Sequence, residues 1–199
     1  MRTSIFAASL LGLVLTATLA GANAAPPPLN AAPPPVTLAI DKRESTLTYH
    51  LLHKLHRVDG TSKLVDGRAR LVDSGAQVMI RVPIESFDSA NTNRDAHMKE
   101  AVEAEKYPHV ELRALVPGFA LPTTFPTTLD KTVKAQLIFH GVTQTIDVPI
   151  KIVVESATKI RATASFGISL EAFKVERPSL MFVKVNDELK LDAVLVFAR

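Results

Sequence analysis

The sequence contains no cysteine, no tryptophan and only two tyrosines among its 199 residues. The absence of cysteine excludes disulfide bonds, a catalytic thiol and a lipid anchor on a cysteine, so the stability of the fold must come from its core. The shortage of aromatic residues argues against a membrane-spanning β-barrel, which needs aromatic girdles at both interfaces. The formal net charge is only +3 and the basic residues are scattered, so nucleic-acid binding is not indicated.

The N-terminal segment has the features of a targeting signal. Arg2 is followed by an uncharged, mainly apolar stretch over 5–20, and the Ala-Asn-Ala tripeptide at 22–24 fits a cleavage site. The stretch is short for an uncleaved anchor helix. We therefore expect residues 1–24 to be a signal peptide and the mature chain to be a periplasmic or secreted protein without stable membrane insertion.

The rest of the chain divides into a linker and one domain. Residues 25–35 are rich in proline, which predicts a stiff, extended linker outside the core. Residues 36–199 suffice for one domain with a sizeable core. Within it, seven segments alternate apolar and polar residues, as half-buried strands do: 46–51, 78–82, 110–114, 132–139, 146–152, 159–166 and 189–197. Strands of this kind must bury their apolar faces together, which favours an antiparallel barrel or sandwich.

Turn-forming residues separate several of these segments. Asp-Gly at 59–60 and 66–67 and Asp-Ser-Gly at 73–75 have turn chemistry, although Gly67 also suits a bulge within a strand. His-Gly-Val-Thr at 140–143 joins two alternating segments. Glycine as the first central residue there fits a two-residue type II′ hairpin turn.

Two stretches depart from the alternation. Residues 91–106 carry apolar residues at helical spacing, and the Asn-Thr pair at 91–92 can cap a helix that starts there. Residues 119–130 are rich in proline and threonine, which predicts a loop long enough to serve as a lid or mouth.

Three histidines, His50, His53 and His56, form an H-x-x-H-x-x-H pattern, and neutral imidazoles bind zinc and copper well. In a continuing strand, His53 would face opposite to His50 and His56. The three could then meet on one metal only if the chain bends near Lys54. A metal- or haem-associated redox protein is therefore kept as an alternative.

No residue has the sequence surroundings of a catalytic group. His97 lies near the start of the expected helix, and the chain has no nucleophile motif such as G-x-S-x-G. Glu85, Asp88 and Asp95 are close in sequence, but nothing fixes the separation that acid–base chemistry requires. We predict no catalytic residue, no enzyme activity and no cofactor.

Several stretches, in the right order, resemble the YceI-like family: Ser45–Tyr49, Val82–Ser89, Asn91–Lys99 followed by Tyr107-Pro108, His140–Thr143 and Phe166–Ile168. The resemblance covers residues 36–199. It implies an all-β domain with one short helix, built as a lipocalin-like antiparallel β-barrel of about eight strands. Members of that family hold long apolar molecules, typically isoprenoids or fatty-acid derivatives. The resemblance therefore implies a non-catalytic carrier whose partner is an apolar small molecule.

The apolar rows and the resemblance together supply candidate binding residues. We predict that the interior is lined by Tyr49, Leu51, Val78, Ile80, Val110, Leu112, Leu137, Phe139, Ile150, Phe166 and Leu191. The polar groups predicted at its mouth are His53, Arg94 and His97, although the sequence around His53 departs from the family pattern. Small inward residues suit a filled barrel as well as a hollow one. A filled structural or interaction barrel is therefore a second alternative, and a homodimer is also left open.

Overall fold

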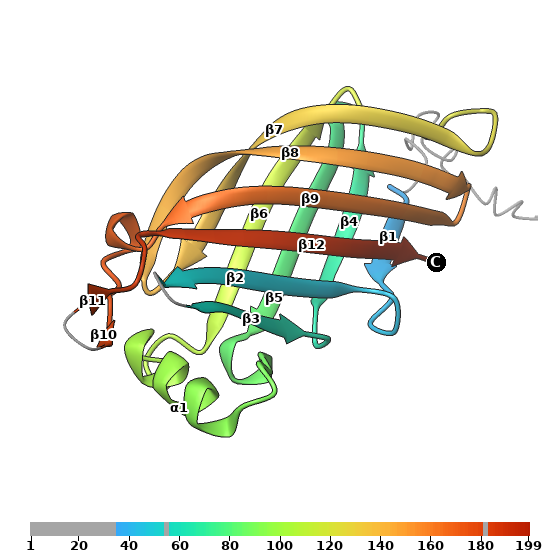
Figure 1. The fold of residues 1–199 in the computed structure, drawn as a ribbon. Helices are drawn as coiled ribbons and strands as arrows, with labels where there is room; N and C mark the ends of the chain where they lie inside the picture. Colours follow the sequence, from blue (N-terminus) through green and yellow to red (C-terminus); the bar gives the residue numbers. More distant parts are fainter. Residues whose placement is uncertain (1–34, 54–55, 181–182) are drawn as a thin grey trace, which may run out of the picture. The chain divides into compact units, whose positions relative to one another are not determined.

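The computed structural model describes residues 35–53, 56–180 and 183–199 (Figure 1). The predicted signal peptide at 1–24 and nearly all of the predicted linker at 25–35 lie outside these residues. The described elements are β1 (Thr37–Ile40), β2 (Thr46–His53), β3 (His56–Ser62), β4 (Asp66–Val72), β5 (Gly75–Pro83), η1 (Ile84–Ser86), α1 (Thr92–Ala101), β6 (His109–Pro117), β7 (Thr127–Phe139), β8 (Val142–Ser156), β9 (Lys159–Ser169), η2 (Glu171–Phe173), β10 (Ser179–Leu180), β11 (Val183–Lys184) and β12 (Glu188–Ala198). None of the described helices is long and apolar enough to cross a membrane.

Eight of these strands form a closed ring with the order β1-β4-β5-β6-β7-β8-β9-β12, in which neighbouring strands are antiparallel. The short strand β1 closes the ring, because Leu38 pairs with Ala69 of β4 while Ile40 pairs with Phe197 of β12. Closure leaves the ring without an unpaired edge. The predicted antiparallel barrel of about eight strands is confirmed, and the sandwich is not found.

The β2–β3 hairpin extends the wall beyond this ring. β2 pairs with β12 from Thr46 to Leu51, next to the point where β1 meets the same strand. An isolated β-bridge between Thr61 and Asp88 joins β3 to the loop that precedes α1. The helix α1 lies at this end of the barrel, beside β3 (Figure 1). The barrel therefore has one end at which a helix, rather than a continuous sheet, borders the interior.

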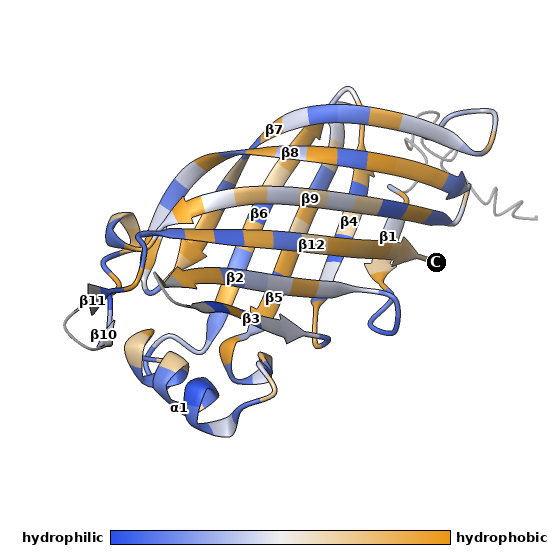
Figure 2. Cartoon of the chain, viewed as in Figure 1, coloured by the Kyte–Doolittle hydropathy of each residue, from blue (hydrophilic) through white to orange (hydrophobic). Residues whose placement is uncertain are grey.

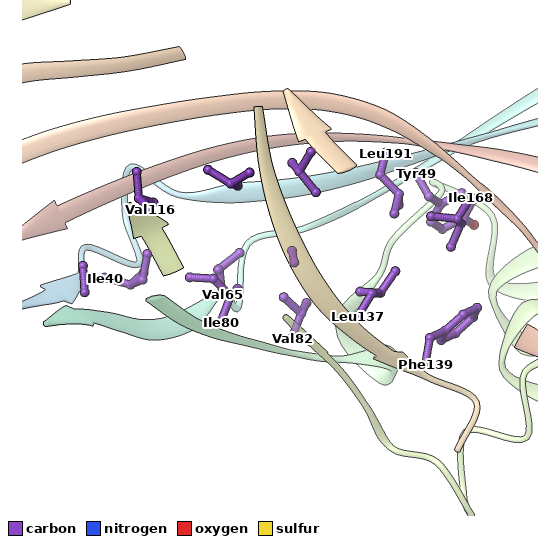
Figure 3. Packing of buried hydrophobic residues seen from close by; sticks show 14 of the residues in the cluster. Ile40, Tyr49, Val65, Ile80, Val82, Val116, Leu137, Phe139, Ile168 and Leu191 are labelled. Atoms are coloured by element: carbon purple, nitrogen blue, oxygen red, sulfur yellow. The ribbon is translucent and has the colours of Figure 1, made fainter. Parts of the chain in front are cut away.

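The alternation in the sequence becomes an inner and an outer face. Along β7, Val133, Leu137 and Phe139 are buried. Lys134 and Gln136 between them are exposed. The same alternation colours the strands in Figure 2. In Figure 3 the labelled side chains fill the interior in a row from Ile40 and Val116 to Phe139 and Ile168. All seven predicted strand segments lie within strands of the structure.

Two predicted turns are corrected by the structure. Gly60 is not in a turn but inside β3 as the register partner of Tyr49, because the chain has already reversed between His53 and His56. At the β7–β8 hairpin, Phe139 pairs with Val142, so His140 and Gly141 are both central residues. Their φ angles are 51° and 71°, which makes the turn type I′ rather than type II′. The turn at 73–74 is confirmed, and Gly67 lies within β4.

The helix and the long loop are both shorter than predicted. α1 ends at Ala101, and the backbone leaves the helical path at Glu103, whose φ is +46°. The loop predicted at 119–130 ends at Pro126, because β7 starts at Thr127 and pairs there with Val154 of β8. Cross-strand hydrogen bonds thus override the loop-like composition of residues 127–130.

Candidate ligand-binding site

The barrel interior contains two adjoining cavities. The inner cavity lies between the strands of the ring, has a volume of about 130 Å³ and is lined by apolar residues. The mouth cavity lies next to α1 and the segment from β9 to β12, and its volume is about 510 Å³. Four residues border both cavities: Leu47, Val110, Leu137 and Leu191. The interior of the barrel is therefore wider at its helix end than in its middle.

The structure places the predicted site residues around these two cavities. Those that line the inner cavity alone are Val78, Ile80, Leu112, Ile150 and Phe166. Those that line the mouth cavity alone are Tyr49, Leu51, Phe139, Arg94 and His97. Val110, Leu137 and Leu191 line both. The side chain of His53 lies outside the described part of the structure, so its predicted position at the mouth stays a prediction.

The mouth cavity also has a wall that the sequence analysis missed. It comes from η1, from the segment between β9 and β12, and from the inner face of α1, with Ile84, Phe87, Met98, Val102, Leu170, Val175 and Val185 among its residues. Most of these residues lie outside regular strands, so no period-two pattern marks them. Only the helical spacing of Met98 and Val102 was a signal that could have found part of this wall.

Arg94 and His97 stand one helical turn apart and present the polar part of the mouth cavity. The helix begins here because the Asn91 side chain accepts a hydrogen bond from the backbone N–H of Arg94 at 3.0 Å. The Arg94 guanidinium donates to the carbonyl oxygen of Ser89 at 2.7 Å. Both Arg94 and His97 are exposed although they line the cavity, so the cavity reaches the surface at α1.

Tyr49 is the buried polar group of the mouth cavity. Its ring lies against Phe87, with 5.5 Å between the ring centroids, and over Gly60, whose lack of a side chain leaves room for it. Burial raises the pKa of the Tyr49 hydroxyl to about 12, and the nearby Asp95 carboxylate acts in the same direction. The hydroxyl therefore keeps its proton and can donate a hydrogen bond into the cavity.

The three histidines do not lie on one continuing strand, because His53 and His56 are register partners across a hairpin. His50 lies on the outer side of the barrel, where its Nδ1 is 2.7 Å from Asp59 and its Nε2 is 2.8 Å from Asp192. Within the part of the chain that the structure describes, no group of three or more potential ligands is placed to hold a metal ion. The side chains of His53 and His56 lie outside that part.

Two of the three acidic residues that lie close together in sequence stabilise the loop before α1. Asp88 accepts a hydrogen bond from the backbone N–H of Ala90 at 2.7 Å, and Asp95 accepts one from Ser89 at 3.0 Å. Neither carboxylate lines the mouth cavity as described. These hydrogen bonds stabilise the loop that leads into α1, the helix that carries Arg94.

Comparison with known proteins identifies the class to which this barrel and its cavities belong. The model of the YceI-like domain matches residues 38–197, which is nearly the whole described domain. The chain therefore belongs to the YceI-like family, as the sequence resemblance implied. A search among curated proteins found no match to the chain.

Solved structures share the fold at low sequence identity. A polyisoprenoid-binding domain from Saccharophagus degradans, implicated in plant cell wall breakdown, is 19% identical with a TM-score of 0.69, over 81% of this chain and 97% of that one. BcnA from Burkholderia cenocepacia is 16% identical with a TM-score of 0.64, over 79% and 98% of the two chains. The YCEI protein of Campylobacter jejuni is 17% identical with a TM-score of 0.57, over 74% and 88%.

Proposed function

We propose that this domain is a non-catalytic carrier that holds a lipid-like molecule, an isoprenoid or fatty-acid derivative, inside its barrel. The observation that carries the proposal is the mouth cavity of about 510 Å³ that continues into the apolar inner cavity. An apolar chain transferred from water into such a space gains about 25 cal/mol per Å² of buried surface, less the cost of ordering it. The ligand reported for the similar Saccharophagus degradans domain, a polyisoprenoid, supports this class of ligand.

The arrangement of polar groups supports an orientation for the ligand. The mouth cavity has polar side chains at Tyr49, Arg94, His97 and Ser179, whereas the inner cavity is lined by apolar residues. A ligand with a polar head and an apolar tail would therefore place its head beneath α1 and its tail toward the inner cavity. Tyr49 would donate a hydrogen bond to the head from its protonated hydroxyl.

The same groups support a binding role. The hydrogen bond to the Ser89 carbonyl oxygen holds the Arg94 guanidinium in place, which suits it to bind the polar head of a ligand. With the predicted signal peptide, these features support a carrier that works in the periplasm or outside the cell.

The first test is native mass spectrometry of the protein purified from an exporting host, followed by extraction of any bound molecule. We expect an apolar molecule of defined mass. A polypeptide that carries nothing, and takes up neither a dansyl-labelled fatty acid nor dansyl-labelled farnesol, would overturn the proposal and favour the filled barrel.

A cavity-filling variant tests whether the tail of the ligand lies in the inner cavity. Ala164 lines the inner cavity, whereas Thr163, next to it on β9, does not. Ala164→Leu should weaken uptake of the longer dansyl-labelled chains, because it occupies part of the small inner cavity. Thr163→Leu adds the same side chain on the other face and should leave uptake unchanged. Equal uptake by both variants would show that the tail does not reach the inner cavity.

A further inference from the structure

The outer wall of the barrel carries a basic hollow of about 900 Å³ that the carrier function does not use. Its lining includes four cations, and no aspartate or glutamate is among the described residues that line it. The cations and the two exposed apolar residues between them, which we call the basic outer face, are Arg68, Arg70, Met79, Arg113, Leu115 and Lys134. None of them lines the mouth cavity.

Strand register explains why these residues gather on one face. Arg68 of β4 is the partner of Met79 of β5, and Met79 is the partner of Arg113 of β6. Register partners project from the same face of a sheet with their Cβ atoms close together. A cation, an apolar side chain and a second cation therefore form one row across three strands. In the next row Arg70 lies two strands from Leu115, with Gln77 between them.

Two of the four cations have no carboxylate partner among the described residues. Arg113 is 3.0 Å from Glu111, and Lys134 is 3.0 Å from Asp147. Arg68 and Arg70 form no ion pair within the part of the chain that the structure describes, and both are exposed. The basic outer face thus keeps a surplus of positive charge that an anionic partner can neutralise.

The apolar residues of the face are also exposed. Met79 is 38% exposed and Leu115 is 41% exposed, and both stand among the cations that line the hollow. Cations beside exposed apolar side chains are the combination that peripheral proteins present to a membrane interface. The cations meet lipid phosphates, while the apolar side chains enter the boundary of the acyl chains.

We propose that the basic outer face docks this domain on the surface of a bilayer that contains anionic phospholipids. A second copy of the chain would bring like charges together, which disfavours a dimer through this face. Single-stranded nucleic acid would need aromatic side chains for base stacking, and the described lining of the hollow has none. The proposal goes beyond the carrier function and does not depend on it, although a lipid carrier must exchange its cargo at a membrane.

Vesicle flotation tests the proposal with the chain recovered from an exporting host. The vesicles contain phosphatidylcholine alone or phosphatidylcholine mixed with phosphatidylglycerol. We expect binding to the mixed vesicles only, and weaker binding as the salt concentration rises. Each basic side chain near an anionic surface contributes roughly a fivefold gain, so Arg68→Gln with Arg70→Gln should weaken binding about thirtyfold.

The matched control removes two positive charges from another part of the barrel surface. Lys151 on β8 and Lys190 on β12 are exposed and lie outside the basic outer face. Lys151→Gln with Lys190→Gln should keep most of the binding. An equal loss in both double variants would show a general effect of net charge and overturn the proposal.

A third double variant separates a bilayer from other anionic partners. Met79→Ser with Leu115→Ser keeps every cation and should also weaken vesicle binding, because the apolar insertion is lost. Unchanged binding by this variant, or binding of the parent to neither kind of vesicle, would refute bilayer docking. The latter result would leave an acidic protein as the partner of this face. Uptake of the dansyl probes without vesicles should be unchanged in these three double variants, which separates this result from a failure of the carrier function.

Discussion

Raising the pH through the range in which tyrosine ionises should destabilise the folded domain through Tyr49. Burial, assisted by the Asp95 carboxylate, raises the pKa of this hydroxyl from 10.0 to about 12. Below pH 10 the hydroxyl is protonated in the folded and unfolded chains alike, so this contribution to stability is complete. Between pH 10 and 12 the unfolded chain releases the proton while the folded domain retains it, so the contribution is lost as the pH rises. A shift of two pKa units corresponds to about 3 kcal/mol.

The small number of tyrosines makes this measurement direct. The chain has two, so a Tyr107→Phe variant reports Tyr49 alone through the ultraviolet absorbance of its phenolate. Denaturant unfolding of the parent and of Tyr49→Phe, below pH 10 and near pH 12, gives the energetic side, because other titrating groups cancel in the comparison. An absorbance midpoint near pH 10.0 in the folded Tyr107→Phe variant would refute the reasoning, since it would mean that the mouth cavity is wet at Tyr49.

Three further substitutions test the support of the barrel and its mouth. In Gly60→Ala the new Cβ would clash with the ring of Tyr49, so we expect a loss of stability of about 1–3 kcal/mol and altered probe uptake. Gly167→Ala, whose Cβ meets only the flexible end of a side chain, should cost less. Equal costs for the two variants would contradict the clash with Tyr49. Leu38→Ala removes a fully buried side chain from β1, and denaturant unfolding should show a loss of about 2–5 kcal/mol; a loss below about 1 kcal/mol would mean that β1 does not close the barrel. Asn91→Ala removes the cap of α1 and should cost about 1 kcal/mol while speeding probe release in stopped-flow measurements, whereas Asn91→Asp keeps the acceptor and should behave like the parent.

Side-chain patterning in the sequence was enough to predict most of the wall of the barrel. A strand with one buried face must alternate apolar and polar residues, so β7 could be located from its apolar residues 133–139 without knowing its neighbours. The start of α1 was equally readable, because Asn91 can cap a helix by a contact within four residues. The inward position of Leu137 and Phe166 follows from the same alternation.

Features that depend on distant partners could not be found in this way. β1 is four residues long and exists because it pairs with both β4 and β12, and its own sequence has too few alternations to reveal it. Gly60 resembles a turn residue, but it pairs with Tyr49 inside β3, where a side chain would meet the ring of that distant residue.

Sequence by itself therefore determined the class of the fold, most strands and which of their residues face inward, because these follow from local alternation and capping. Only the tertiary structure decided that the interior is narrower in the middle of the barrel than at its helix end, with cavities of about 130 and 510 Å³. It also decided that Arg68, Met79 and Arg113 share one outer row. Cavity size and surface rows depend on how residues far apart in the chain come together, and no single segment carries that information.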